Sequence, residues 1–246
     1  MALTQLVDEI LVDHATCKGR EVSIRLGRDD QFDDNLTIRL KAINLAAASY
    51  KRTVATLREE HVYPLLRILP NPTFYLLPQG HQENLMFDTR ALFQASRELL
   101  DFYLGCLWRA TAGSATRTPV KFGSFLPQLA SGVYDCRPEP IFAWLKQGIS
   151  WLYTIRAIRN ELKVNPASAQ FHIETNNFMM KIALPFPQEH EIMLPFLNLR
   201  NLDAAQANRR FFLTLSLDEQ FGTTPRLWNE CENMFNLSFP RDESAR

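Results

Sequence analysis

The chain has 246 residues, and its 27 lysines and arginines balance 27 aspartates and glutamates, so its formal net charge at pH 7 is zero. Hydrophobic residues make up 46% and charged residues 22%, close to the average of globular proteins. These proportions exclude wholesale disorder, collagen-like repeats and a strongly basic protein that coats nucleic acid. The length suits one large domain or two small ones, with a core that needs no disulfides.

Neither a secretion signal nor a membrane span is expected. Asp8, Glu9 and Asp13 interrupt the apolar stretch near the start, and no window approaches about 18 uninterrupted apolar residues. The four cysteines are scattered without a C-x-x-C pair, which is typical of neither a disulfide framework nor a zinc site. We therefore expect a cytoplasmic, reduced protein in which Cys106 is a buried apolar residue.

The first clear element is a long helix over residues 36–61. Apolar residues recur there at alternating spacings of four and three, which indicates one continuous buried stripe. The stripe consists of Leu36, Leu40, Ile43, Ala47, Tyr50, Val54, Leu57 and His61. A stripe of about seven turns needs long partner helices, which favours a bundle. Before it, residues 1–16 are expected to form a short amphipathic helix and residues 21–26 a short strand.

The sequence also contains residues that are typical of the two ends of a helix. Asp33, Asp34 or Asn35 is expected to cap its N-terminus. Pro64 is expected to end it, because proline lacks an N–H and its ring clashes with the preceding turn. The next segment, residues 69–80, contains three prolines and is expected to be a loop with its TFYLL part extended.

Two further helices are expected, from about Asn84 to Trp108 and from Pro140 to Lys163, with a polar connection at 110–124. The apolar face of the first consists of Leu85, Leu92, Leu99, Phe102, Tyr103 and Cys106. The apolar face of the second consists of Ile141, Trp144, Leu145, Leu152, Ile155, Ile158 and Leu162.

After residue 166 the pattern changes from helical to extended. QFHIETN and FMMKIALPF, separated by Asn176-Asn177, predict a β-hairpin, because asparagine tolerates positive φ. Residues 203–221 and 225–236 are candidate helices, and the polar tail RDESAR is expected to fray.

The pattern as a whole predicts a mainly α fold, a helical bundle with a small β-hairpin after the third helix. Residues 1–166 are expected to form the bundle core, with its last helix at 140–163. Residues 167–246 are expected to pack on the bundle as hairpin and C-terminal helices, within the same domain.

The third helix carries the one chemical lead. Arg156, Asn160 and Lys163 share one border of its apolar face at i, i+4 and i+7, and Arg159 falls on the apolar seam itself. A guanidinium keeps its proton at physiological pH, so it needs an anion, carbonyl oxygens or water as partner. One interpretation is a phosphate site made of arginine forks.

The alternative interpretation is structural. Arg159 would then snorkel or pair with Glu98 or Asp101 of the preceding helix, inside a scaffold or protein-interaction bundle. Glu161 is a poorer partner, because residues at i and i+2 do not face each other.

The closing sequence IRAIRNELK resembles the signature helix of the HEPN superfamily, and FDTRALFQASRELLDFYL resembles the helix that packs beside it. The similarity spans roughly residues 35–165. It implies a helical bundle whose last core helix carries an arginine, commonly followed by asparagine, which are Arg159 and Asn160 in this chain. Many members are metal-independent ribonucleases that act as dimers and recur in toxin–antitoxin and phage-defence systems, while others are non-catalytic binding modules.

The family's histidine, four to six residues after its arginine, is missing. Val164, Asn165 and Pro166 stand around that position, and no histidine occurs between His81 and His172. Without an imidazole, the family's proton transfer loses its best acid–base group near neutral pH. Lys163 replaces it poorly unless burial lowers its pKa.

We therefore expect a dimeric HEPN-like protein that binds nucleotide or RNA phosphate without ribonuclease activity, with no catalytic residue assigned. The expected binding residues are Arg156, Arg159, Asn160 and Lys163. Arg159 would anchor the anion, its two basic neighbours would add charge, and Asn160 would orient groups by hydrogen bonding. A third interpretation is a ribonuclease that takes its histidine from another segment, such as His172. No cofactor is expected, and no metal, because the histidines lack H-x-x-x-H or H-E-x-x-H spacing.

Overall fold

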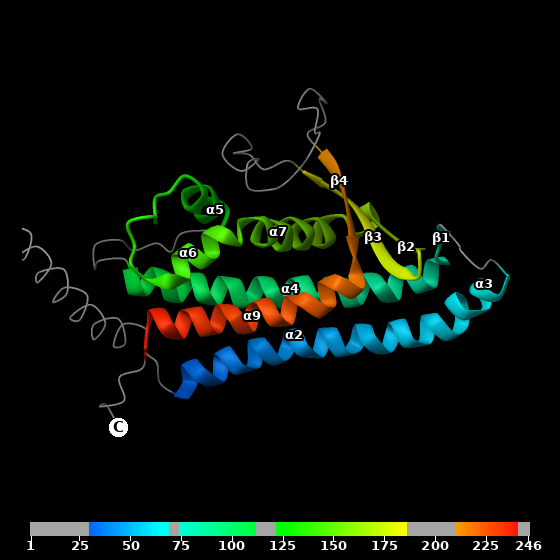
Figure 1. Cartoon of the computed structure of the whole chain (residues 1–246), viewed down its shortest axis with the longest axis horizontal. Helices are drawn as coiled ribbons and strands as arrows, with labels where there is room; N and C mark the ends of the chain where they lie inside the picture. The colour runs from blue at the N-terminus through cyan, green and yellow to red at the C-terminus, as the bar shows by residue number, and fades with distance from the viewer. Residues whose placement is uncertain (1–29, 69–73, 112–121, 186–209, 241–246) are drawn as a thin grey trace, which may run out of the picture.

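The structure is a computed structural model that describes residues 30–68, 74–111, 122–185 and 210–240. The helix expected at 1–16, the strand expected at 21–26 and the C-terminal tail lie outside these residues. Long helices lie side by side along the longest axis of the molecule (Figure 1). They are α2 (Asp30–Leu57), α4 (Gln79–Thr111), α7 (Ile149–Val164) and α9 (Leu217–Ser238). The prediction of a mainly α fold, a helical bundle with a small β-hairpin, is confirmed, and the hairpin is part of a four-stranded sheet.

Helical conformation continues past the predicted end of the first helix. α2 passes into a π-helical turn, η1 (Arg58–Val62), and then into α3 (Tyr63–Ile68). The N–H of Tyr63 donates to the carbonyl of Arg58, five residues back instead of four. The prediction that Pro64 ends the helix was wrong, because this wider turn accommodates a residue that has no N–H and a bulky ring.

α2 also begins earlier than predicted, at Asp30. Phe32 is buried, and its ring centroid lies 5.2 Å from that of Phe102 and 6.3 Å from that of Phe235. Burying this ring favours an additional helical turn. Positions 33–35 therefore lie inside the helix, and the prediction that one of them is its N-cap was wrong.

α4 is the central helix and contacts α2, α7 and α9. It extends beyond the predicted 84–108 at both ends. Its predicted face is buried, with Phe102 partly so, and Cys106 is fully buried as expected. Tyr103 stacks on Trp228 of α9 at 6.2 Å, and Trp228 meets Trp151 of α7 edge to face at 5.4 Å. Three helices thus share one aromatic core.

The helix predicted at 140–163 is two helices, α6 (Pro140–Gln147) and α7, which meet at Gly148. The prediction of one continuous helix was wrong. A Cβ added to Gly148 would lie 2.2 Å from the indole nitrogen of Trp151, so the chain breaks where only glycine fits. The connection expected at 110–124 is also shorter, because α4 runs to Thr111 and α5 (Phe122–Ala130) begins within it.

The predicted hairpin is present as β2 (Ala169–Glu174) and β3 (Asn177–Pro185), after a short 3-10 helix, η2 (Pro166–Ser168). Its turn lies at Thr175-Asn176, with φ of 47° and 68°, one residue before the predicted Asn176-Asn177. The predicted turn position was therefore wrong by one residue, although the reason, an asparagine at positive φ, applies.

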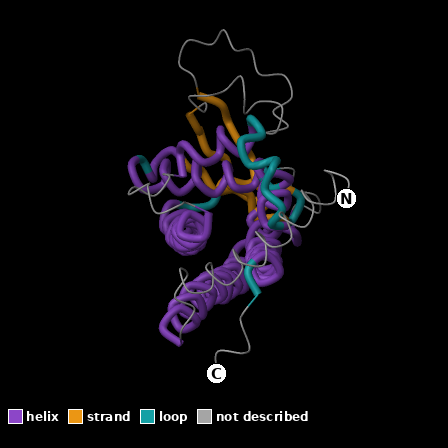
Figure 2. The backbone as a smooth tube through the Cα atoms, turned by 90° about the vertical axis from the view of Figure 1, so that its left-hand side faces the viewer, coloured by secondary structure: helices purple, strands orange, loops and turns teal. Residues whose placement is uncertain are grey.

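Two further strands complete an antiparallel sheet of order β1-β2-β3-β4. They are β1 (Tyr75–Leu76), from the segment predicted to be extended, and β4 (Arg210–Ser216). The sheet packs on α4, α7 and α9, on the side of the bundle away from α2 (Figures 1 and 2).

The prediction of a helix over 203–221 was wrong where β4 pairs with β3. Ser216 sets the boundary, because its Oγ accepts a hydrogen bond from the N–H of Glu219 at 3.3 Å and so caps α9. α9 contains the helix predicted at 225–236 and is itself a bundle helix that packs on α2, α4 and α6.

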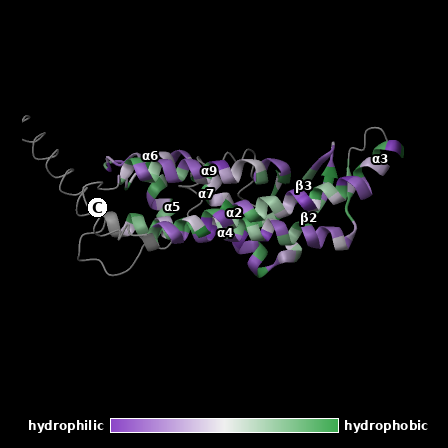
Figure 3. Cartoon of the chain, turned by 90° about the horizontal axis from the view of Figure 1, so that it is seen from below, coloured by the Kyte–Doolittle hydropathy of each residue, from purple (hydrophilic) through white to green (hydrophobic). Residues whose placement is uncertain are grey.

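Hydrophilic and hydrophobic residues are interleaved along the bundle helices (Figure 3). In the described part of the chain, none of the helices has the length and apolar character needed to cross a membrane.

Candidate functional site

The predicted binding residues lie along one edge of α7. Arg156 and Arg159 are half-buried, and Asn160 and Lys163 are exposed. Arg159 Nε donates to Oε1 of Gln94 on α4 at 2.9 Å, and Arg159 Nη1 donates to Oδ1 of Asn160 at 3.2 Å. The structure therefore joins Arg159 to Asn160, while no hydrogen bond among the described residues links Lys163 to them.

α4 brings a third arginine, Arg97, that sequence analysis missed. Its side chain is 17% exposed and pairs with Asp101, one turn later, at 2.9 Å. Burial lowers the pKa of Arg97, the carboxylate of Asp101 opposes this, and the charges of Arg156 and Arg159 lower the pKa further. The charges of Arg156 and Arg159 thus act on Arg97, and we call Arg97, Arg156 and Arg159 the arginine cluster. Helical spacing gave no signal for Arg97, because it belongs to this group only once α4 lies beside α7.

Arg156 lies against the first turn of α5. A Cβ added to Gly123 would lie 3.0 Å from Nη2 of Arg156. The N-terminus of a helix carries a positive partial charge, so this contact adds a second source of positive potential to the cluster. Within the described residues, Arg156 has no hydrogen bond or ion pair that would offset its charge.

In the described part of the chain, the nearby carboxylates pair with neither Arg156 nor Arg159. Asp101 binds Arg97, and Glu98 accepts a hydrogen bond from Nε2 of Gln94 at 2.6 Å. Glu161 is buried and pairs with Arg210 of β4. Among the described residues Arg159 has no ion pair, so the alternative pairing with Glu98 or Asp101 is not formed.

His172, the candidate histidine of the third interpretation, lies in β2. It is buried, its ring stacks on Phe74 at 4.7 Å, and its Nε2 lies 3.6 Å from a carboxylate oxygen of Glu174. These contacts hold it in the sheet, and no hydrogen bond in the described structure joins it to the arginine cluster.

No family model, curated protein or solved structure matches the chain.

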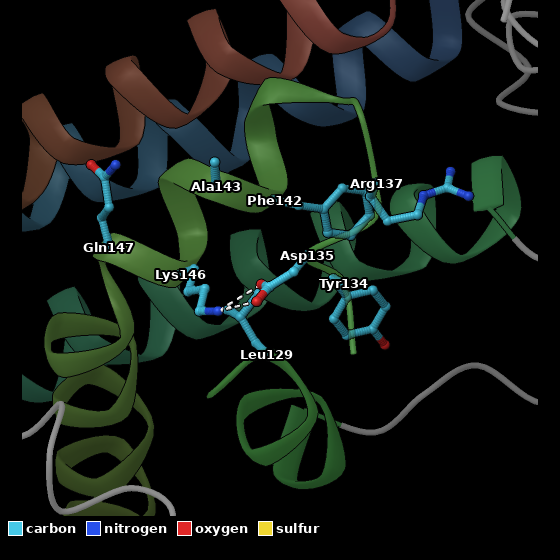
Figure 4. A pocket seen from close by; sticks show the side chains of 8 residues that line it. All are labelled: Leu129, Tyr134, Asp135, Arg137, Phe142, Ala143, Lys146 and Gln147. Atoms are coloured by element: carbon cyan, nitrogen blue, oxygen red, sulfur yellow. Dashed lines mark hydrogen bonds and ion pairs between the residues drawn. The ribbon is translucent and has the colours of Figure 1, made fainter. Parts of the chain in front are cut away.

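A cavity of about 440 Å³ between α5 and α6 is the other candidate site (Figure 4). It is lined by Leu129, Tyr134, Asp135, Arg137, Phe142, Ala143, Lys146 and Gln147. Lys146 Nζ lies 2.6 Å from both carboxylate oxygens of Asp135, and Arg137 pairs with Glu139. Because these charges cancel in pairs, the cavity suits an anion less well than the arginine cluster does.

Proposed function

We propose that the protein binds nucleotide or RNA phosphate at the arginine cluster. The observation that carries this proposal is that neither Arg156 nor Arg159 forms an ion pair with a described residue, while the charges of both act on Arg97, which pairs with Asp101. Holding such charges together costs free energy in the absence of a counter-ion, and a phosphate dianion offsets that cost.

Arg159 has N–H donors that make no hydrogen bond within the described residues, and these suit a phosphate. Its guanidinium has five N–H groups, and the two hydrogen bonds to Gln94 and Asn160 use two of them. The remaining donors lie in a plane, which matches the oxygens of a phosphate. Arg156 adds charge beside α5, and the exposed Lys163 extends the positive edge of α7.

The family resemblance supports the same assignment, because the Arg159–Asn160 pair of its motif is hydrogen-bonded in this chain. The missing histidine favours binding without cleavage. We extend the proposal to a cytoplasmic homodimer, as in many HEPN proteins, with a role in a toxin–antitoxin or phage-defence system.

Fluorescence anisotropy of a labelled single-stranded RNA, titrated at several salt concentrations, tests the proposal. Arg156→Gln/Arg159→Gln is expected to weaken binding at every salt concentration. It should also reduce the slope of log K against log salt by about 1.4, since each phosphate contact on a single strand contributes about 0.7. Incubation of the same RNA without metal is expected to leave it intact.

Lys51→Gln/Arg52→Gln on α2 is the matched control, because it removes the same two positive charges from exposed positions on another helix. If Arg156→Gln/Arg159→Gln binds RNA and nucleotides as the control does, the site assignment fails and a scaffold role is favoured. Metal-free cleavage that disappears in His172→Asn would instead establish the ribonuclease interpretation.

A further inference from the structure

Two histidines that are 20 residues apart meet at the end of the bundle where α2 and α4 are connected. His61 lies in the π-helical turn η1, and His81 lies in the first turn of α4. Their Nε2 atoms are 2.8 Å apart, and their rings meet edge to face with centroids 4.3 Å apart. A carboxylate oxygen of Glu60 lies within 4.8 Å of both histidine ligand atoms.

The short contact between the rings constrains their protonation. Two imidazolium groups are both donors, so they cannot form this hydrogen bond, and at least one Nε2 carries a lone pair. A neutral imidazole nitrogen is the form of histidine that binds a metal ion. The second ring offers the same atom once its proton moves to Nδ1.

The elements that carry the ligands are fixed by packing. Val62 is buried, and Arg58 of the same turn binds Asp218 of α9 at 3.2 Å. The N–H of His81 donates to the carbonyl of Pro78 at 3.0 Å, which fixes the start of α4. Two nitrogens bound to one tetrahedral zinc lie about 3.4 Å apart. The two Nε2 atoms are 2.8 Å apart, so a small rotation of the side chains is enough to admit an ion.

We propose that Glu60, His61 and His81 form a zinc site that ties the end of α2 to the start of α4. Two imidazole nitrogens and one carboxylate oxygen are a usual ligand set for Zn²⁺, and a water molecule completes the tetrahedron. Glu60 is exposed and the histidines are half-buried, so the ion can enter from solvent. The fourth coordination position, which the water molecule fills, faces solvent. This site is independent of the arginine cluster.

Titration of the full-length protein with Zn²⁺ in a calorimeter, and with Co²⁺ followed by visible absorption, tests the proposal. The wild type is expected to bind one Zn²⁺ per chain, to unfold at a higher temperature with Zn²⁺, and to give the strong absorption of tetrahedral Co²⁺. His61→Asn and His81→Asn are each expected to weaken binding by at least the roughly 10–100-fold that loss of a ligand's hydrogen-bond partner costs. Glu60→Gln is expected to weaken it less.

Glu59→Gln is the matched control, since Glu59 is the adjacent exposed carboxylate of the same turn. Circular dichroism checks that each variant is folded. Zinc affinity that is equal in the wild type and both histidine variants, or no zinc binding by the wild type, overturns the proposal. If a variant does not fold, ¹⁵N resonances of the wild-type imidazoles decide, because Zn²⁺ must shift those of His61 and His81.

Discussion

Arg159 is held by a neutral partner, the amide oxygen of Gln94 at 2.9 Å. A carboxylate in that place would cancel the charge of the guanidinium, whereas an amide oxygen satisfies one donor and leaves the charge available. Glu161, two residues further along α7, has the opposite arrangement, because its buried carboxylate is neutralised by Arg210. α7 therefore carries an arginine that no described carboxylate neutralises and a glutamate that is neutralised by β4.

This contrast predicts different stability losses for two arginine variants. Arg159→Ala is expected to lower the free energy of unfolding by about 1 kcal/mol, since it removes hydrogen bonds to neutral groups. Arg210→Ala is expected to cost about 2–3 kcal/mol, because it leaves the carboxylate of Glu161, 9% exposed, without its counter-charge. Urea unfolding followed by circular dichroism measures both, and a larger loss for Arg159→Ala would contradict the assignment.

Gly148→Ala is expected to destabilise the protein by about 1–3 kcal/mol. The new methyl group would overlap the indole of Trp151, which itself packs on Trp228 in the aromatic core. Gly222→Ala in α9 is the control, because a Cβ there meets nothing within 4 Å. It should stabilise the helix by about 0.5–1 kcal/mol, and thermal unfolding of both variants should show shifts of opposite sign.

Replacing Thr175-Asn176 by Asn-Gly is expected to raise the free energy of unfolding by about 0.5–1 kcal/mol. Both positions have positive φ, which a β-branched threonine adopts poorly and which Asn-Gly favours. Asn177→Gly should lower stability, since Asn177 is already in β3 and pairs with Glu174. Denaturant midpoints that move the other way would place the turn one residue later.

Stability is expected to decline in alkali partly through Tyr153. Burial raises the pKa of its phenol from 10.0 to about 12, and the charge of Arg156 opposes this. The unfolded chain therefore loses this proton first. The stabilisation is complete below pH 10 and is lost as the pH rises through about 12, a change of about 3 kcal/mol. In Tyr153→Phe, urea unfolding at increasing pH should show a shallower decline, and an unchanged decline would refute this role.

The sequence predicts the buried stripes well, because helical periodicity depends on residues that are close along the chain. It fails where a distant residue decides the local conformation. The break at Gly148 depends on the position of Trp151, and the early start of α2 depends on Phe102 and Phe235. β4 is a strand because β3 offers it a partner, which no local pattern contains.

Prediction of the candidate site from the sequence is limited in the same way, because residues of different helices come together only in the folded chain. Spacing alone places Arg156, Arg159, Asn160 and Lys163 along one edge of a helix, and in the structure all four belong to α7, where Arg159 is hydrogen-bonded to Asn160. Spacing could not select Arg97 or Gln94, because these residues belong to the site only once α4 lies beside α7. For the same reason, a search for short histidine motifs could not detect the approach of His61 to His81.

The π-helical turn before Pro64 also makes the length of the chain here a structural constraint. It holds one residue more than an ordinary helical turn, and removing that residue would restore a uniform α-helix. The buried residues on either side of the turn, Leu57 and Val62, would stay in register, because the wider turn has already taken up the additional residue. The ring of Pro64 would then meet the carbonyl of an ordinary helical turn, so a single-residue deletion here should be tolerated less well than most substitutions.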